Sequence, residues 1–144
     1  HRQLHKVTNL IKRIKKATVE NTATLNVYDV RIENNLDRQA LYNSGGTATI
    51  YDGAYLTSIA PERSTLHNLN TGTVTILGGT IVSDNLYAIY NEKGNLTIGV
   101  KDGSVDSTKP VIQGNTYGIA ANYTYKFYDG IIKGINASTN NDSK

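Results

Sequence analysis

The chain has 144 residues, with 15 Lys and Arg against 12 Asp and Glu, and it contains no Cys, Met or Trp. This length predicts a single domain, and the absence of cysteine excludes a disulfide framework, a thiol nucleophile and a cysteine-ligated metal site. No apolar run approaches the length of a membrane-spanning helix, and no signal peptide is evident. Because an initiating Met is missing, we expect the sequence to be a fragment or processed piece of a protein.

Residues 1–20 are basic and amphipathic, with six Lys or Arg and one acid, Glu20. Neither Pro nor Gly interrupts the segment, and apolar residues recur at helical spacing, at Leu4, Val7, Ile11 and Ile14. We therefore predict an amphipathic helix that caps the first coil of the repeats that follow. Contact of this helix with a membrane surface is an alternative. Nucleic-acid binding is disfavoured, because the segment has no aromatic residue for stacking on bases.

Residues 21–135 contain a repeat of about 25 residues. Its copies include the similar segments 47–50 and 73–76, and each copy ends in an acidic or glycine turn. The first apolar column of the aligned copies contains Val27, Ile50, Ile76, Ile98 and Phe127. A second column lies two residues earlier, at Leu25, Ala48, Val74, Leu96 and Tyr125. Polar residues stand between these columns, an alternation that is typical of half-buried strands.

Two more apolar columns follow the turns. We expect the third at Ile32, Tyr55, Ile81, Val105 and Ile132. The fourth contains Leu41, Leu66, Ile89 and Ile119. Each repeat therefore offers three short strands, and like residues recur in register from one repeat to the next.

This pattern predicts an all-β fold, a parallel β-helix (solenoid) of about five coils whose neighbouring strands are about 4.8 Å apart. An antiparallel β-sandwich also has many short strands, but it does not require like residues in register. The expected organisation is a capping helix over 1–20, the β-helix over 21–135 and a polar tail over 136–144. Extra residues at 99–100 and around 107–113 are expected to form loops on one face.

The acidic turns are the most site-like feature of the repeats. They place four acids in one column that Gly78 interrupts, at Asp29, Asp52, Asp102 and Asp129. Stacked carboxylates can bind a hard cation or act as an acid/base pair, but Asp before Gly is ordinary turn chemistry. We predict that these acids are structural. His1 and His5 lack a third ligand nearby, so we expect no metal site, and no cofactor motif is present.

Two further columns carry polar and aromatic residues. Asn43, Asn68 and Asn91 are expected to form an internal amide ladder, in which each side chain bonds to the next coil. The residues just before them alternate with the buried column and are expected to face outward. Aromatic faces at such positions can bind sugar rings or partner proteins, and the alternative is that they serve core packing or form plain surface. The candidate ligand contacts are Tyr42, His67, Tyr90 and, beside an acidic turn, Tyr51.

The segments 38–43 (RQALYN), 45–50 (GGTATI) and 72–83 (GTVTILGGTIVS) resemble repeats of bacterial cell-surface adhesin-like proteins. The later segments 96–99, 110–114 and 127–134 look like the closing repeats of the same proteins. The resemblance covers about residues 22 to 135 and does not include the basic segment. It implies a parallel β-helix, display on the cell surface and attachment, and it brings no catalytic motif.

We therefore expect a non-enzymatic, surface-exposed β-solenoid that acts as an adhesive or stalk module of a larger bacterial envelope protein. Its expected partners are a glycan or protein surface and neighbouring copies or further repeats, and its expected location is extracellular or on the cell surface. One alternative is a carbohydrate-active β-helix enzyme, a polysaccharide lyase or hydrolase, which would need converging acids in a groove. Another is a segment of a phage tail fibre or spike, which would form an obligate trimer.

Overall fold

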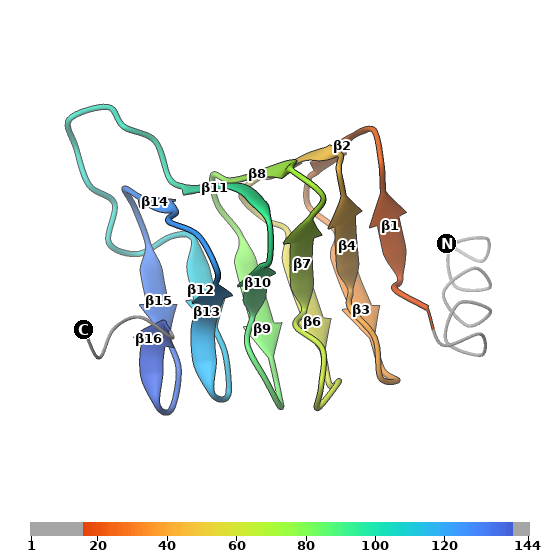
Figure 1. The fold of residues 1–144 in the computed structure, drawn as a ribbon. Helices are drawn as coiled ribbons and strands as arrows, with labels where there is room; N and C mark the ends of the chain where they lie inside the picture. The colour runs from red at the N-terminus through yellow and green to blue at the C-terminus, as the bar shows by residue number, and fades with distance from the viewer. Residues whose placement is uncertain (1–15, 140–144) are drawn as a thin grey trace.

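The computed structural model describes residues 16–139, and the side chains of residues 16–136. Every regular element in this part of the chain is a β-strand, and the strands form three sheets (Figure 1). Sheet A contains β1 (Val19–Asn21), β4 (Leu41–Ser44), β7 (Leu66–Leu69), β10 (Ile89–Asn91), β13 (Tyr117–Ala121) and β16 (Ala137–Thr139). Sheet B contains β2 (Thr24–Val27), β5 (Thr47–Ile50), β8 (Gly72–Ile76), β11 (Gly94–Ile98) and β14 (Lys126–Phe127). Sheet C contains β3 (Arg31–Asn34), β6 (Tyr55–Ser58), β9 (Thr80–Ser83), β12 (Val111–Gln113) and β15 (Ile131–Lys133).

The chain passes through sheets A, B and C in turn, and strands of successive coils pair in parallel. Figure 1 shows the coils side by side along one axis, with β1 near one end and β15 and β16 at the other. The fold is a parallel β-solenoid of about five coils, which confirms the predicted class. The purely parallel pairing excludes the antiparallel sandwich.

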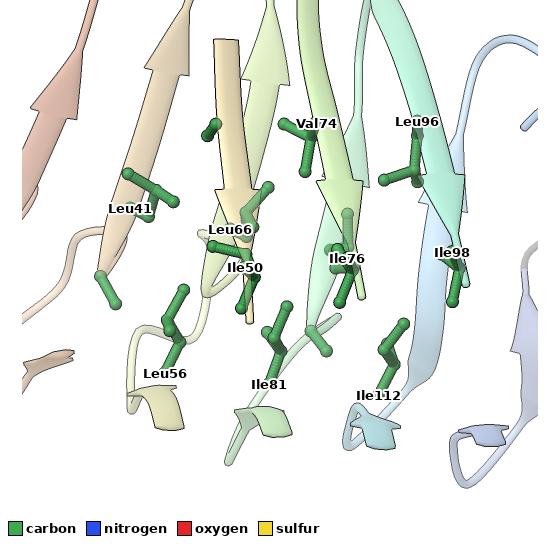
Figure 2. Packing of buried hydrophobic residues seen from close by; sticks show 14 of the residues in the cluster. Leu41, Ile50, Leu56, Leu66, Val74, Ile76, Ile81, Leu96, Ile98 and Ile112 are labelled. Carbon is green, nitrogen blue, oxygen red and sulfur yellow. The ribbon is translucent and has the colours of Figure 1, made fainter. Parts of the chain in front are cut away.

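Inward-facing side chains of successive coils stack into ladders that form the core (Figure 2). The first predicted column is in register across sheet B, where neighbouring coils pair at Val27, Ile50, Ile76, Ile98 and Phe127. The second column is in register from Leu25 to Leu96, and the fourth from Leu41 to Ile119. Most of these side chains are fully buried, whereas Phe127 is 49% exposed because β14 is the edge strand of its sheet.

The third column differs from the prediction at two positions. The turn at 51–54 is one residue longer than the turns at 28–30 and 77–79, so Tyr55 pairs with the outward-facing Arg31 and Leu56 takes the inner position. Val105 is 76% exposed in the loop 99–110, which delays the next strand. The observed column is Ile32, Leu56, Ile81, Ile112 and Ile132.

The predicted capping helix over residues 1–20 is wrong in the part that the structure describes. Residues 16–139 contain no helix, and therefore none that is long and apolar enough to cross a membrane. Residues 19–21 form β1, which pairs in register with β4. These residues pair with sheet A because Val19 continues the fourth apolar column and Asn21 continues the amide column. The rest of the predicted helix, with His1 and His5, lies outside the described residues.

The predicted amide ladder runs through the interior beneath sheet A. Each Nδ2 donates a hydrogen bond to the Oδ1 of the next coil, at 2.8, 2.9 and 3.0 Å, through Asn21, Asn43, Asn68 and Asn91. These amides also donate to the backbone at the corner that leads to sheet B, for example Asn68 to the Gly72 carbonyl oxygen at 3.0 Å. A Cβ atom at Gly72 would lie 2.5 Å from Asn68 Oδ1. Glycine is therefore required at this corner, because the amides fill the space of a side chain.

Candidate binding face on sheet A

Three of the four candidate contact residues lie together on the outer face of sheet A. Tyr42, His67 and Tyr90 occupy equivalent positions on β4, β7 and β10 and are paired in register. The ring centroids are 5.2 Å apart between Tyr42 and His67, and 4.9 Å apart between His67 and Tyr90. Because the inner neighbours of these residues are locked in the core ladder, the rings are held at fixed positions along the solenoid axis.

Two tyrosines that the sequence reasoning missed extend this set. Tyr87 lies 6.0 Å from Tyr90 between ring centroids, and Tyr117 lies 6.1 Å from Tyr87. Tyr42, His67, Tyr90, Tyr87 and Tyr117 thus form one chain of neighbouring rings, which we call the aromatic row. The signal was present in the sequence, because Tyr87 and Tyr117 both stand two residues before a member of the fourth apolar column.

The aromatic row borders a groove. A hollow of about 350 Å³ is lined by Tyr42, His67, Tyr87, Tyr90 and the turn that contains Arg63. A second hollow, of about 300 Å³, is lined by Lys16, Glu20, Arg38 and Tyr42 among others. The two hollows share Gln39, Tyr42 and Arg63 in their linings, so they are adjacent and together extend over several coils. We call the two hollows together the sheet A groove.

His67 is the most constrained side chain of the groove, and only 13% of it is exposed. Its Nε2 lies 2.7 Å from Glu92 Oε1, and its Nδ1 lies 3.2 Å from the amide nitrogen of Gln39. Because that amide nitrogen only donates, Nδ1 accepts and Nε2–H donates to Glu92, which is the neutral tautomer. Burial lowers the pKa of His67, Glu92 opposes this shift, and the nearby positive charge of Arg63 adds to it. Both ring nitrogens are therefore engaged within the protein.

Tyr51 does not join the aromatic row. It lies in the turn that connects sheets B and C, where its ring stacks on Tyr28 with centroids 4.1 Å apart and planes inclined by 11°. A hydrogen bond with Tyr51 is the main cause that raises the pKa of the Tyr28 hydroxyl. The four candidates thus divide into a group of three on sheet A and a separate tyrosine pair at another corner.

The predicted acidic column is incomplete, because Asp102 lies in the loop 99–110 rather than at a turn of the stack. Its carboxylate accepts hydrogen bonds from the backbone and hydroxyl of Ser104, which lower its pKa. Asp129 accepts from the backbone N–H groups of Val100 and Asp106, at 2.8 Å each, and so fixes two points of the loop. These contacts agree with the predicted structural role of both acids.

Asp52 has a different partner. Its carboxylate lies 2.7 Å from Lys109 Nζ, and this bond is the main cause that lowers the pKa of Asp52. Lys109 belongs to the end of the same loop, which in Figure 1 projects beyond β14 and β15 before it returns to β12. Within residues 16–139, no three His, Cys, Asp or Glu side chains gather in a way that could hold a metal ion.

Comparison of the chain with protein-family models, curated proteins and solved structures finds no match. The sheet A groove, with its aromatic row and its basic turns, is the feature of the described chain that is best suited to hold a ligand.

Proposed function

We propose that this chain is a non-enzymatic β-solenoid displayed at the bacterial cell surface, and that it binds a glycan along the aromatic row as an adhesive or stalk module of a larger envelope protein. The observation that carries the proposal is the row itself, five neighbouring rings on and beside sheet A, four of which line a hollow. Tyrosine offers an apolar ring face and a polar hydroxyl, which suits the mixed surface of a sugar.

Rigidity supports binding at this face. Tyr42, His67 and Tyr90 project from strands whose opposite sides are packed in the core, so little order has to be gained when a ligand binds. The repeat also gives each coil a similar outward position. A ligand that is itself a repeating chain can therefore contact several coils at once, and weak contacts add up.

The hydrogen bonds of His67 and of the acidic turns favour binding of the glycan over its cleavage. The acid–base pair at the sheet A groove is His67, which lines it, with the neighbouring Glu92, and both imidazole nitrogens already have partners. A general base needs a free lone pair directed at the substrate. The acids of the turns are occupied by loop contacts at other corners, away from the aromatic row.

The surface location and the bacterial origin are supported by the resemblance of segments 38–50 and 72–83 to adhesin-like repeats. The stalk role is supported by the last described coil, where the edge strands β14 and β15 expose Phe127 (49%) and Ile131 (36%). Edges of this kind are normally covered. Further repeats or neighbouring copies are the expected cover in an envelope protein built from coils.

The test is a glycan array screened with the wild-type chain and two variants, combined with assays for unsaturated products and reducing ends. Tyr90→Ala removes the ring at the centre of the aromatic row, whereas Tyr51→Ala removes a stacked tyrosine from another corner and serves as the control. We expect binding that Tyr90→Ala abolishes and Tyr51→Ala retains, with no product released. Release of oligosaccharide, or equal binding by both variants, would refute the proposal.

A further inference from the structure

Two arginines repeat along the sheet A groove. Arg38 and Arg63 each stand three residues before paired members of the fourth column, Leu41 and Leu66, so they occupy equivalent places on adjacent coils. Paired strands of adjacent coils are about 4.8 Å apart. The two side chains therefore leave the backbone at corresponding places of neighbouring turns, beside the aromatic row, and both line the second hollow. We call them the basic column.

Both guanidinium groups keep donors for a ligand. Arg38 Nη1 donates to the Asp37 carbonyl oxygen at 3.1 Å, and Arg63 Nη1 donates to the Glu62 carbonyl oxygen at 2.9 Å. Arg38 also lies 3.8 Å from the Asp37 carboxylate, beyond hydrogen-bond distance. A guanidinium has five N–H donors in a planar fork. Each of these single backbone bonds therefore orients the group and leaves its other N–H donors available to a ligand.

The arginines and the rings face the same space. Arg63 lines both hollows together with Tyr42, and its charge reaches His67, where it lowers the pKa of the ring. Lys16 adds a third cation at the coil-one end. The groove also contains the carboxylates of Glu20 and Glu62, so cations exceed acids in its lining by one.

From this juxtaposition we infer that the sheet A groove selects a carboxylated glycan, with sugar rings against the aromatic row and successive carboxylates at Arg38 and Arg63. The inference rests on the proposed function and names its ligand class. Guanidinium binds carboxylate in a bidentate manner and with defined geometry. Because both columns run from coil to coil, the polysaccharide lies along the solenoid axis, and a uronic acid in consecutive units presents its charges at the two arginines.

The experiment compares binding of polygalacturonate oligomers, their methyl esters and a neutral glucan of the same length. The ester keeps the sugar backbone and loses only the charge. The variant Arg38→Gln/Arg63→Gln keeps polar side chains at both positions, shorter than those of arginine, and removes both guanidinium groups. The control is Arg31→Gln, which removes an arginine that packs over Tyr55 on sheet C, with its guanidinium carbon 4.6 Å from the ring centroid.

We expect wild type to bind the acid about tenfold more tightly than the ester, with a preference that falls as salt rises. The double variant should bind acid and ester equally, at the wild-type affinity for the ester, while Arg31→Gln retains the preference. Equal binding of acid and ester by wild type, or an unchanged preference in the double variant, overturns the inference and leaves the proposed function standing. Binding of none of the three glycans also overturns the inference, while the proposed function is decided separately by the glycan array. Thermal melts of each variant establish that it is folded, and Arg63→Gln alone, a change at an exposed residue, replaces the double variant if that variant unfolds.

Discussion

The amide ladder provides the sharpest test of how the coils are held together. Asn68 is a central member: its Oδ1 accepts from Asn43 at 2.9 Å, and its Nδ2 donates to Asn91 and to the Gly72 carbonyl oxygen, both at 3.0 Å. Asn68→Ala leaves Asn91 Oδ1 without its donor and leaves one N–H of Asn43 without its acceptor, in an interior where all three side chains are fully buried. The Gly72 carbonyl oxygen also loses its side-chain donor, but we count only the two side-chain groups.

A buried polar group that loses its partner costs about 1–3 kcal/mol. With two such groups and a small void, we expect Asn68→Ala to lower the free energy of unfolding by about 3–5 kcal/mol. That is a large fraction of the stability of a typical domain.

The matched control is Asn85→Ala. The Asn85 amide also bonds to a neighbouring coil, at 2.6 Å from the Ile59 carbonyl oxygen, but this contact is exposed. Water can replace an exposed partner, so we expect a loss below about 1 kcal/mol. Urea unfolding followed by circular dichroism measures both values. Equal shifts of the unfolding midpoint in the two variants would refute the view that buried, connected amides stabilise the stack.

Two further predictions concern the core and pH. Ile76 is fully buried, so Ile76→Asp places an unpaired carboxylate in the core and should abolish the cooperative melt. Thr75→Asp, one residue away on the outer face, should shift the melting temperature by only a few degrees. Similar melts for the two variants would contradict the assigned register. Because burial lowers the pKa of His67 in the folded state, the unfolded chain binds its proton first as pH falls. Stability from this residue is therefore complete above its ordinary pKa and is lost on acidification below it. Melts from about pH 7.5 to 5 should fall more steeply for wild type than for His67→Gln, and parallel curves would show that His67 does not titrate in this way.

The sequence is sufficient to predict the ladders that repeat without interruption. Like residues at Ile50, Ile76 and Ile98 mark one inner position, because a parallel stack places equivalent residues opposite each other. The same reasoning fails wherever a turn changes length, since a single added residue exchanges inner and outer faces. The extra residue in the turn 51–54 therefore moved the inner position from Tyr55 to Leu56, although Leu56 and Ser58 show the inward alternation by themselves.

The binding face was predictable only in part, for a related reason. Tyr42, His67 and Tyr90 share one register position, so alignment of the repeats brings them together. The groove depends also on the turns that lead into sheet A, which supply Gln39 and Arg63. The alignment places these residues just before the fourth column, but it does not show that their turns enclose a hollow. Tyr51 shows that residue type alone does not identify a ligand contact. Its ring stacks on Tyr28 of the neighbouring coil and lies apart from the aromatic row.

The strand register links the inward-facing ladders of this solenoid to its outward-facing side chains. An inward residue tolerates little variation, because the coils on both sides must match its shape, and this requirement fixes the angle at which its outward neighbours stand. The rings at Tyr42 and Tyr90 are therefore positioned by Leu41 and Ile89, one residue away in the core. A solenoid can change the ligand that it recognises by substitution of one outward column while its core remains the same. This chain has two such outward columns, one of aromatic residues on sheet A and one of threonines at 49, 75 and 97 on sheet B. Of these two columns, only the aromatic one borders the sheet A groove with its arginines, and for this reason we place recognition on sheet A.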